Sequence, residues 1–245
     1  MTPEPRARVI RAIVFDLDNT LTDFMKMKAA AKAAAIDSMI DAGFALPREQ
    51  LLERVDAIYD VRGMEFQRVF DELLEREFGE VDPKILAAGI VGYRRARDSA
   101  LVLYPHAQLV LLELLKRGIR LGVVSDAPRL QVWMRLCALG LQHVFDAVVT
   151  FDDTGERKPA AAPFREVLRR LNVEPHEAIM IGDWADRDVV GGKSLGMTTV
   201  FARYGDTFDT QSSGADHDID DLLELIGIVD RIHGASPGSA QPMEG

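Results

Sequence analysis

The sequence contains one cysteine, Cys137, among 245 residues. A single thiol excludes an intrachain disulfide framework and any zinc site that uses several cysteines. The five histidines show no spacing typical of metal ligands. Cys137 is therefore expected to be a core thiol on a helix.

Long apolar runs are also absent. No segment approaches the roughly 20 apolar residues of a membrane span, and the stretch MTPEPRARVIRAIVF holds no apolar core of the length found in signal peptides. We therefore expect a cytoplasmic protein that has no membrane partner. A composition of 47% hydrophobic and 28% charged residues is typical of a soluble globular chain, with room for one large core or a core plus a smaller domain.

Basic residues are fewer than acidic residues. Lysine and arginine number 29 against 39 aspartate and glutamate residues, which gives a net charge of -10. This balance argues against general binding to the phosphate backbone of nucleic acid. An anionic substrate would need local positive charge, or a metal ion, to approach this protein.

The order of the expected elements predicts an α/β fold. Residues 10–15 form an apolar run typical of a buried strand, and residues 24–97 contain only helical patterns, one of them over 63–79. After Leu101, strands expected at 119–125, 146–151, 177–183 and 197–202 alternate with helices, two of them expected at 161–171 and 185–196. Alternation of this kind indicates right-handed crossovers and a doubly wound parallel sheet with helices on both faces.

The helical block is therefore an insertion between the first strand and the rest of the sheet. We expect residues 1–23 and 96–233 to form one core and residues 24–95 to form an inserted all-helical domain. Residues 234–245, which are small, polar and rich in proline and glycine, are expected to be a disordered tail.

Small polar and acidic residues follow three of the expected strands. Asp16 and Asp18 come after the first strand with no basic residue beside them in the sequence. Ser125 ends a later strand and Asp183 ends another, with Lys158 ahead of an expected helix between them. Carboxyl ends of parallel strands meet at one edge of a sheet, where ligands bind. Acidic groups with a hydroxyl and a lysine provide the nucleophile, the oxygen ligands for a hard cation and the donors that phosphoryl transfer needs.

Taken in order, the motifs DLDNTLTD, VVSDA, RKP and GDWADRD resemble those of the haloacid dehalogenase-like (HAD) hydrolase superfamily. The resemblance covers about residues 9–204 and is to phosphatase-type members with a helical cap inserted after the first motif. It implies a Rossmann-like core, Mg²⁺ as cofactor, and hydrolysis of a small-molecule phosphate monoester through an aspartyl-phosphate.

The resemblance also implies roles for individual residues. Asp16 resembles the nucleophile and Asp18 the general acid and base. Ser125, with the backbone amides near Asp126, would hold the transferring phosphoryl group, and Lys158 would neutralise its charge. The metal ligands it implies are Asp16, the Asp18 carbonyl and Asp183, with Asp188 supporting them. Thr20 is expected to fix the turn after the first strand and to lie among the substrate-binding residues.

Simpler interpretations and other activities stay open at this point. Ser125 could be a strand-end cap, Lys158 a solvated surface residue, and the DxDNT stretch a turn with capping side chains. A haloacid dehalogenase or a phosphomutase could use the same scaffold, as could a binding protein without catalysis. A small phosphorylated metabolite is the expected partner. A homodimer through the cap or the core is compatible with the Ala/Met-rich residues 24–39.

Overall fold

The computed structural model describes residues 9–234 and divides into two compact units. The expected tail at 234–245 lies outside the described residues from position 235 onward. Unit 1 comprises the described residues up to Thr22 together with those from Leu103 onward, and unit 2 comprises Asp23–Val102. The expected boundary between residues 95 and 96 falls inside a helix, α4, which continues to Ala100.

Unit 1 contains one six-stranded parallel sheet in the order β3-β2-β1-β4-β5-β6. The strands are β1 (Ala12–Phe15), β2 (Arg120–Ser125), β3 (Ala147–Thr150), β4 (Ala178–Gly182), β5 (Thr198–Ala202) and β6 (His217–Ile219). Its helices are α5 (Ala107–Lys116), α6 (Arg129–Ala138), α7 (Phe151–Thr154), α8 (Ala161–Leu171), α9 (Val190–Leu195) and α10 (Glu224–Gly234). Short helical turns are η1 (Pro175–Glu177), η2 (Ala185–Val189) and η3 (Arg203–Gly205).

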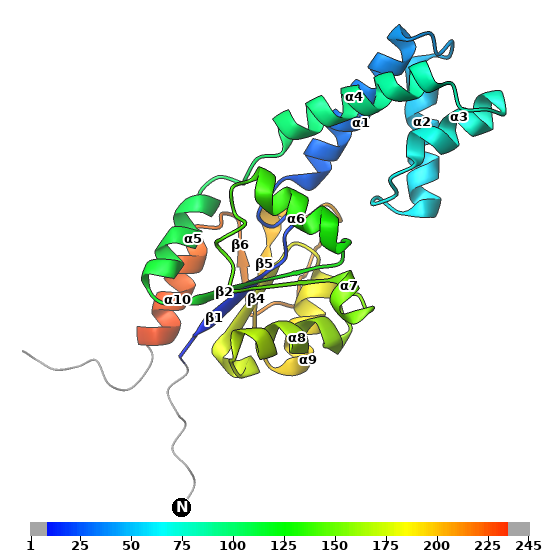
Figure 1. Ribbon diagram of the computed structural model, residues 1–245. Coiled ribbons are helices and arrows are strands. Elements are labelled where there is room, and N and C mark those ends of the chain that lie inside the picture. Colours follow the sequence, from blue (N-terminus) through cyan, green and yellow to red (C-terminus); the bar gives the residue numbers. More distant parts are fainter. Residues whose placement is uncertain (1–8, 235–245) are drawn as a thin grey trace, which may run out of the picture. The chain divides into compact units, whose positions relative to one another are not determined.

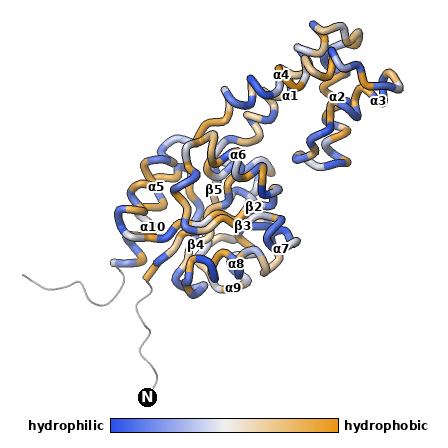
Figure 2. Tube along the Cα trace, in the orientation of Figure 1, coloured by the Kyte–Doolittle hydropathy of each residue, from blue (hydrophilic) through white to orange (hydrophobic). Residues whose placement is uncertain are grey.

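Side chains of β1 alternate between the two faces of the sheet, as the period of a strand requires. Ile13 and Phe15 belong to a cluster formed with α5, α6 and α10, whereas Ala12 and Val14 belong to a cluster formed with α8. Figure 1 shows α5 beside α10, and α8 beside α9. In Figure 2 the hydrophobic colour is concentrated on the central strands. The expected α/β class with helices on both faces is confirmed.

Unit 2 is entirely helical, as expected for this part of the chain. Its helices are α1 (Phe24–Asp41), α2 (Arg48–Arg62), α3 (Val69–Phe78) and α4 (Pro83–Ala100). Helices α1 and α4 pack along each other, so closely that a Cβ on Gly92 would lie 2.6 Å from the Ala34 carbonyl oxygen. Helix α3 begins later than the sequence predicts, because Gly63 adopts a φ of +85° and the chain turns before Val69.

Two further expectations are corrected by the structure. Cys137 lies on α6 as predicted but is exposed, since the buried face of that helix carries Val132, Arg135 and Leu136. The helix expected over 185–196 begins as a π-helical turn, η2, before α9. Among the described residues, no helix has the length and apolar character needed to cross a membrane.

Candidate active site

Three adjacent strands deliver the residues of the candidate site. Asp16 directly follows β1, Ser125 ends β2, and Asp183 directly follows β4. Because β2, β1 and β4 are neighbours in a parallel sheet, their carboxyl ends lie together, as the sequence predicted. All three side chains are buried, with Asp16 7%, Ser125 4% and Asp183 4% exposed.

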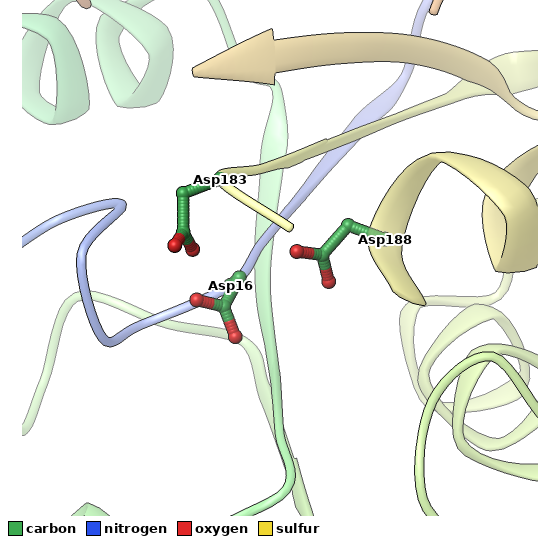
Figure 3. A group of neighbouring side chains, drawn as sticks. All are labelled: Asp16, Asp183 and Asp188. Carbon is green, nitrogen blue, oxygen red and sulfur yellow. The ribbon is translucent and has the colours of Figure 1, made fainter. Parts of the chain in front are cut away.

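Three carboxylates meet at this edge of the sheet. One oxygen each of Asp16, Asp183 and Asp188 lies within 4.8 Å of the others, and Figure 3 shows the three side chains converging. Asp188 reaches the cluster from η2, whose π-helical turn brings it over the end of β4. A Cβ on Gly182 would lie 2.2 Å from its Oδ2, so only glycine leaves room for this carboxylate.

Lys158 supplies the positive charge of the cluster. Its Nζ lies 2.5 Å from Asp16 Oδ1 and 2.7 Å from Asp188 Oδ1. Burial alone would lower the pKa of Lys158, but the carboxylates of Asp16 and Asp188 outweigh that effect and raise it above its usual value. Asp16 therefore has no basic neighbour in the sequence, but it contacts a lysine in the folded protein.

The carboxylate cluster fits a divalent cation. When all are ionised, Asp16, Asp183 and Asp188 face one ammonium, so the cluster keeps an excess of negative charge. Burial, followed by repulsion from Asp16, raises the pKa of Asp183, and burial also raises that of Asp188. Oxygen ligands of this kind suit a hard cation. The three carboxylates would hold such an ion.

Thr20 lies inside this cluster. Its Oγ1 is 3.3 Å from Asp16 Oδ2 and 3.2 Å from Asp183 Oδ1, so its hydroxyl contacts carboxylates that we expect to bind a metal. The Tyr204 hydroxyl donates to the Thr20 carbonyl oxygen at 2.8 Å and fixes the turn after β1. Gly205 permits this approach, because a Cβ there would lie 1.7 Å from the Asn19 carbonyl oxygen.

Asp18 points to a different partner. Its Oδ2 accepts a hydrogen bond from Arg135 Nη1 at 2.8 Å, and the arginine side chain is only 9% exposed. Among the described residues, the group of three carboxylates that could hold a metal does not include the Asp18 side chain. Its carbonyl oxygen stays a predicted ligand.

Sequence reasoning missed Arg135. A signal for it was present, because Val132, Arg135 and Leu136 form one buried face of α6. A charged residue on an otherwise apolar helix face requires a buried partner. Asp186, in contrast, is exposed and lies outside the group of three carboxylates.

Ser125 and Asp126 both lie at the end of β2, but their side chains accept hydrogen bonds from different groups. Ser125 Oγ accepts the Ala127 amide at 3.2 Å. Asp126 Oδ1 accepts the backbone amide of Lys158 at 2.9 Å, and Oδ2 accepts Arg187 Nη1 at 2.8 Å. The Asp126 carboxylate therefore holds other parts of the site in place, which leaves its backbone for the substrate role that the sequence predicted.

Residues 10–196 match the family model described as haloacid dehalogenase-like hydrolase. The chain belongs to this family. The resemblance found in the four motifs is thereby confirmed, and the acidic triad agrees with the divalent metal that HAD hydrolases generally use.

Relatives of this HAD hydrolase cover both of its units. The glyceraldehyde 3-phosphate phosphatase of Methanocaldococcus jannaschii is 35% identical over 224 residues, which are 90% of this chain and 97% of that protein. The ribulose-1,5-bisphosphate 5-phosphatase of Halopiger xanaduensis is 31% identical over 89% of this chain and 98% of that protein. The crystal structure of a HAD phosphatase from Thermococcus onnurineus is similar with a TM-score of 0.69 and 28% identity, over 90% of this chain and 98% of the other.

Proposed function

We propose that this HAD hydrolase is a Mg²⁺-dependent phosphatase that hydrolyses a small phosphate monoester through a phosphorylated Asp16. The observation that supports the proposal best is the buried contact of Asp16 with Lys158 inside the carboxylate triad. An ionised carboxylate at the end of β1 is a nucleophile, and the adjacent ammonium offsets the charge of an incoming phosphate. Phosphatases among the relatives at 31–35% identity support the same reaction class.

In the first step, an Asp16 oxygen attacks phosphorus and the bond from phosphorus to the leaving oxygen breaks. That oxygen keeps the electron pair and takes a proton from the Asp18 carboxyl group. The Ser125 hydroxyl and nearby amides hold the phosphoryl oxygens. Mg²⁺ on Asp16, Asp183 and Asp188 supplies charge neutralisation when it is bound.

In the second step, water attacks the phosphorus of the phosphorylated Asp16. The Asp18 carboxylate takes the proton of that water, the bond from phosphorus to the Asp16 oxygen breaks, and inorganic phosphate leaves. Contact with Arg135 keeps the Asp18 carboxyl group in place through both steps. Asp18 also distinguishes this reaction from dehalogenation, because a departing halide needs no proton.

The substrate is proposed to be a small phosphorylated metabolite, selected by the helical residues 24–95 acting as a cap. Helical caps of this kind exclude water and contact the part of the substrate that is not transferred. Glyceraldehyde 3-phosphate is the first compound to test, since it gives the M. jannaschii relative its name. Ribulose 1,5-bisphosphate is the second, on the same ground.

The decisive experiment measures release of inorganic phosphate from both esters and from a folded phosphoprotein, with and without Mg²⁺. We expect wild-type protein to release phosphate only with the metal, Asp16→Asn to be inactive, and the small esters to be preferred over the phosphoprotein. Asp220→Asn is the matched control, because that carboxylate is 85% exposed and lies in the same unit.

Three results would contradict the proposal. Full activity of Asp16→Asn would show that Asp16 is not the nucleophile. Halide release from a 2-haloacid without phosphate release would indicate a dehalogenase. Isomerised sugar phosphate in place of free phosphate would indicate a phosphomutase.

A further inference from the structure

Arg187 is a charged residue of unit 1 that the proposed reaction does not use. Its guanidinium carbon lies 3.5 Å from the centroid of the Trp184 ring, close enough for stacking with cation–π attraction. Trp184 also packs on Phe208, with ring centroids 4.4 Å apart and an interplanar angle of 36°. The aromatic pair thus restricts the plane of the Arg187 side chain.

The same guanidinium group is bound to Asp126. Arg187 Nη1 donates to Asp126 Oδ2 at 2.8 Å, and the two side chains are 33% and 16% exposed. The other Asp126 oxygen accepts the backbone amide of Lys158 at 2.9 Å. One carboxylate therefore joins three segments of the chain, namely the end of β2, the loop before α8, and η2.

The backbone position of Lys158 determines where its ammonium lies. Its Nζ is 2.5 Å from Asp16 Oδ1 and 2.7 Å from Asp188 Oδ1, in a site where its side chain is 4% exposed. A displaced loop would withdraw the ammonium from both carboxylates. Displacements of about 1 Å in a catalytic site can lower rates by about 100-fold.

We propose that Arg187 is a positioning residue for Lys158, which acts through the Asp126 carboxylate and is itself held by Trp184 and Phe208. This inference rests on the proposed function, because it concerns the lysine assigned to the transferring phosphoryl group. It also gives Trp184 a role in orienting the arginine that holds this loop.

The test compares Arg187→Met with Arg117→Met. Arg117 is a matched control, since it is 29% exposed, lies in unit 1 and also binds carboxylates, those of Glu113 and Asp230. We expect Arg187→Met to lower kcat by about 10- to 100-fold with little change in KM, and the control to keep wild-type kcat. Arg187→Lys should recover only part of the loss, because an ammonium can reach the carboxylate but cannot stack as a planar guanidinium does.

A double-mutant cycle separates positioning from a general effect on the fold. If Arg187 acts through Lys158, then Arg187→Met causes no further loss of kcat in the Lys158→Met protein. A loss that persists in that background, a change in KM alone, or a wild-type kcat in Arg187→Met would overturn the inference. If Arg187→Met does not fold, Arg187→Lys and Asp126→Asn take its place in the cycle.

Hydrogen exchange supplies a measurement that does not depend on activity. We expect the backbone amide of Lys158 to exchange at least about 10-fold faster in Arg187→Met than in wild type or Arg117→Met, since its acceptor is no longer fixed. Wild-type protein that hydrolyses no ester would defeat the proposed function, and unchanged exchange at Lys158 would defeat the role of Arg187. The two failures are therefore distinguishable.

Discussion

Asp183 contacts a different group from its two acidic neighbours, Asp16 and Asp188. Asp16 and Asp188 each contact the Lys158 ammonium, whereas Asp183 meets the hydroxyl of Thr20. Burial and repulsion from the neighbouring carboxylates raise its pKa, which means that its charged form destabilises the folded protein. Without a bound cation, the ionised Asp183 side chain therefore lowers the free energy of unfolding.

Asp183→Asn tests this conflict between stability and function. In EDTA we expect the substitution to raise the melting temperature, because it removes charge repulsion. Added Mg²⁺ should stabilise wild-type protein by about 2.7 kcal/mol at a hundredfold excess over Kd, and it should leave Asp183→Asn unchanged. Calorimetry checks both expectations, with Asp220→Asn behaving as wild type throughout. A lower melting temperature of Asp183→Asn in EDTA would contradict them.

The sequence predicted which residues lie together at this edge of the sheet, because their order along the chain carries that information. Asp16, Ser125 and Asp183 each end or follow a strand, and the parallel sheet brings them together as predicted. Pairing across long separations could not be predicted in this way. Arg135 is 117 residues from Asp18, and only the packing of α6 on the sheet brings them together.

At the scale of elements, Asp153 joins three helices of unit 1. Its Oδ2 accepts the amide and hydroxyl of Thr150 ahead of α7, and its Oδ1 accepts Arg129 of α6 and Arg170 of α8. Burial alone would raise the pKa of Asp153. The hydrogen bonds from Thr150 and the pair with Arg170 outweigh it and lower the pKa to about 2.

This lowered pKa predicts how stability depends on pH. A carboxylate whose folded pKa lies below its unfolded value of 3.8 stabilises the fold above that value, and its contribution disappears as pH falls through about 2. Asp153→Asn should therefore lose about 2 kcal/mol of unfolding free energy at pH 7 and progressively less toward pH 2. Urea unfolding across this range checks it. A loss that stays constant with pH would show that the charge is not responsible.

Elements with strong periodicity were predicted well, and short ones were not. The helix expected over residues 161–171 coincides with α8. In contrast, β6 was not predicted, because it has three residues and pairs only at the edge of the sheet. Helix α10 was also not predicted, although its 11 residues equal the length of α8. A Cβ on Gly191 would lie 2.2 Å from the Phe164 ring, so glycine at this position allows α9 to pack against α8.

At the scale of the whole molecule, unit 2 has its own hydrophobic core. Gly92 tests whether it also has its own stability. In Gly92→Ala the new Cβ would lie 2.3 Å from Ser38 Oγ and 2.6 Å from the Ala34 carbonyl oxygen. We expect the overpacking to destabilise the unit by about 1–3 kcal/mol. This cost exceeds the stabilisation of up to about 1 kcal/mol that alanine gives a helix relative to glycine.

Hydrogen exchange resolves this effect by unit. Amides in α1 to α4 should exchange faster in Gly92→Ala, while those of the sheet in unit 1 keep their wild-type rates. Gly227→Ala is the control, because the nearest atom to its new Cβ is Arg231 Nη1 at 3.5 Å, and it should stabilise α10 slightly. Equal acceleration in both units would show that they unfold as one.

The position of β1 has a consequence for synthesis of the protein. This strand is made first, yet both of its neighbours come much later: β2 begins at Arg120 and β4 at Ala178. At 5–20 residues per second, the ribosome needs about 10–30 s to pass from β1 to β4. During that interval residues 23–102 are complete while the strand that carries Asp16 still lacks a partner. The nascent chain thus exposes this apolar strand longest, and the helical insertion prolongs the interval before the strand can pair.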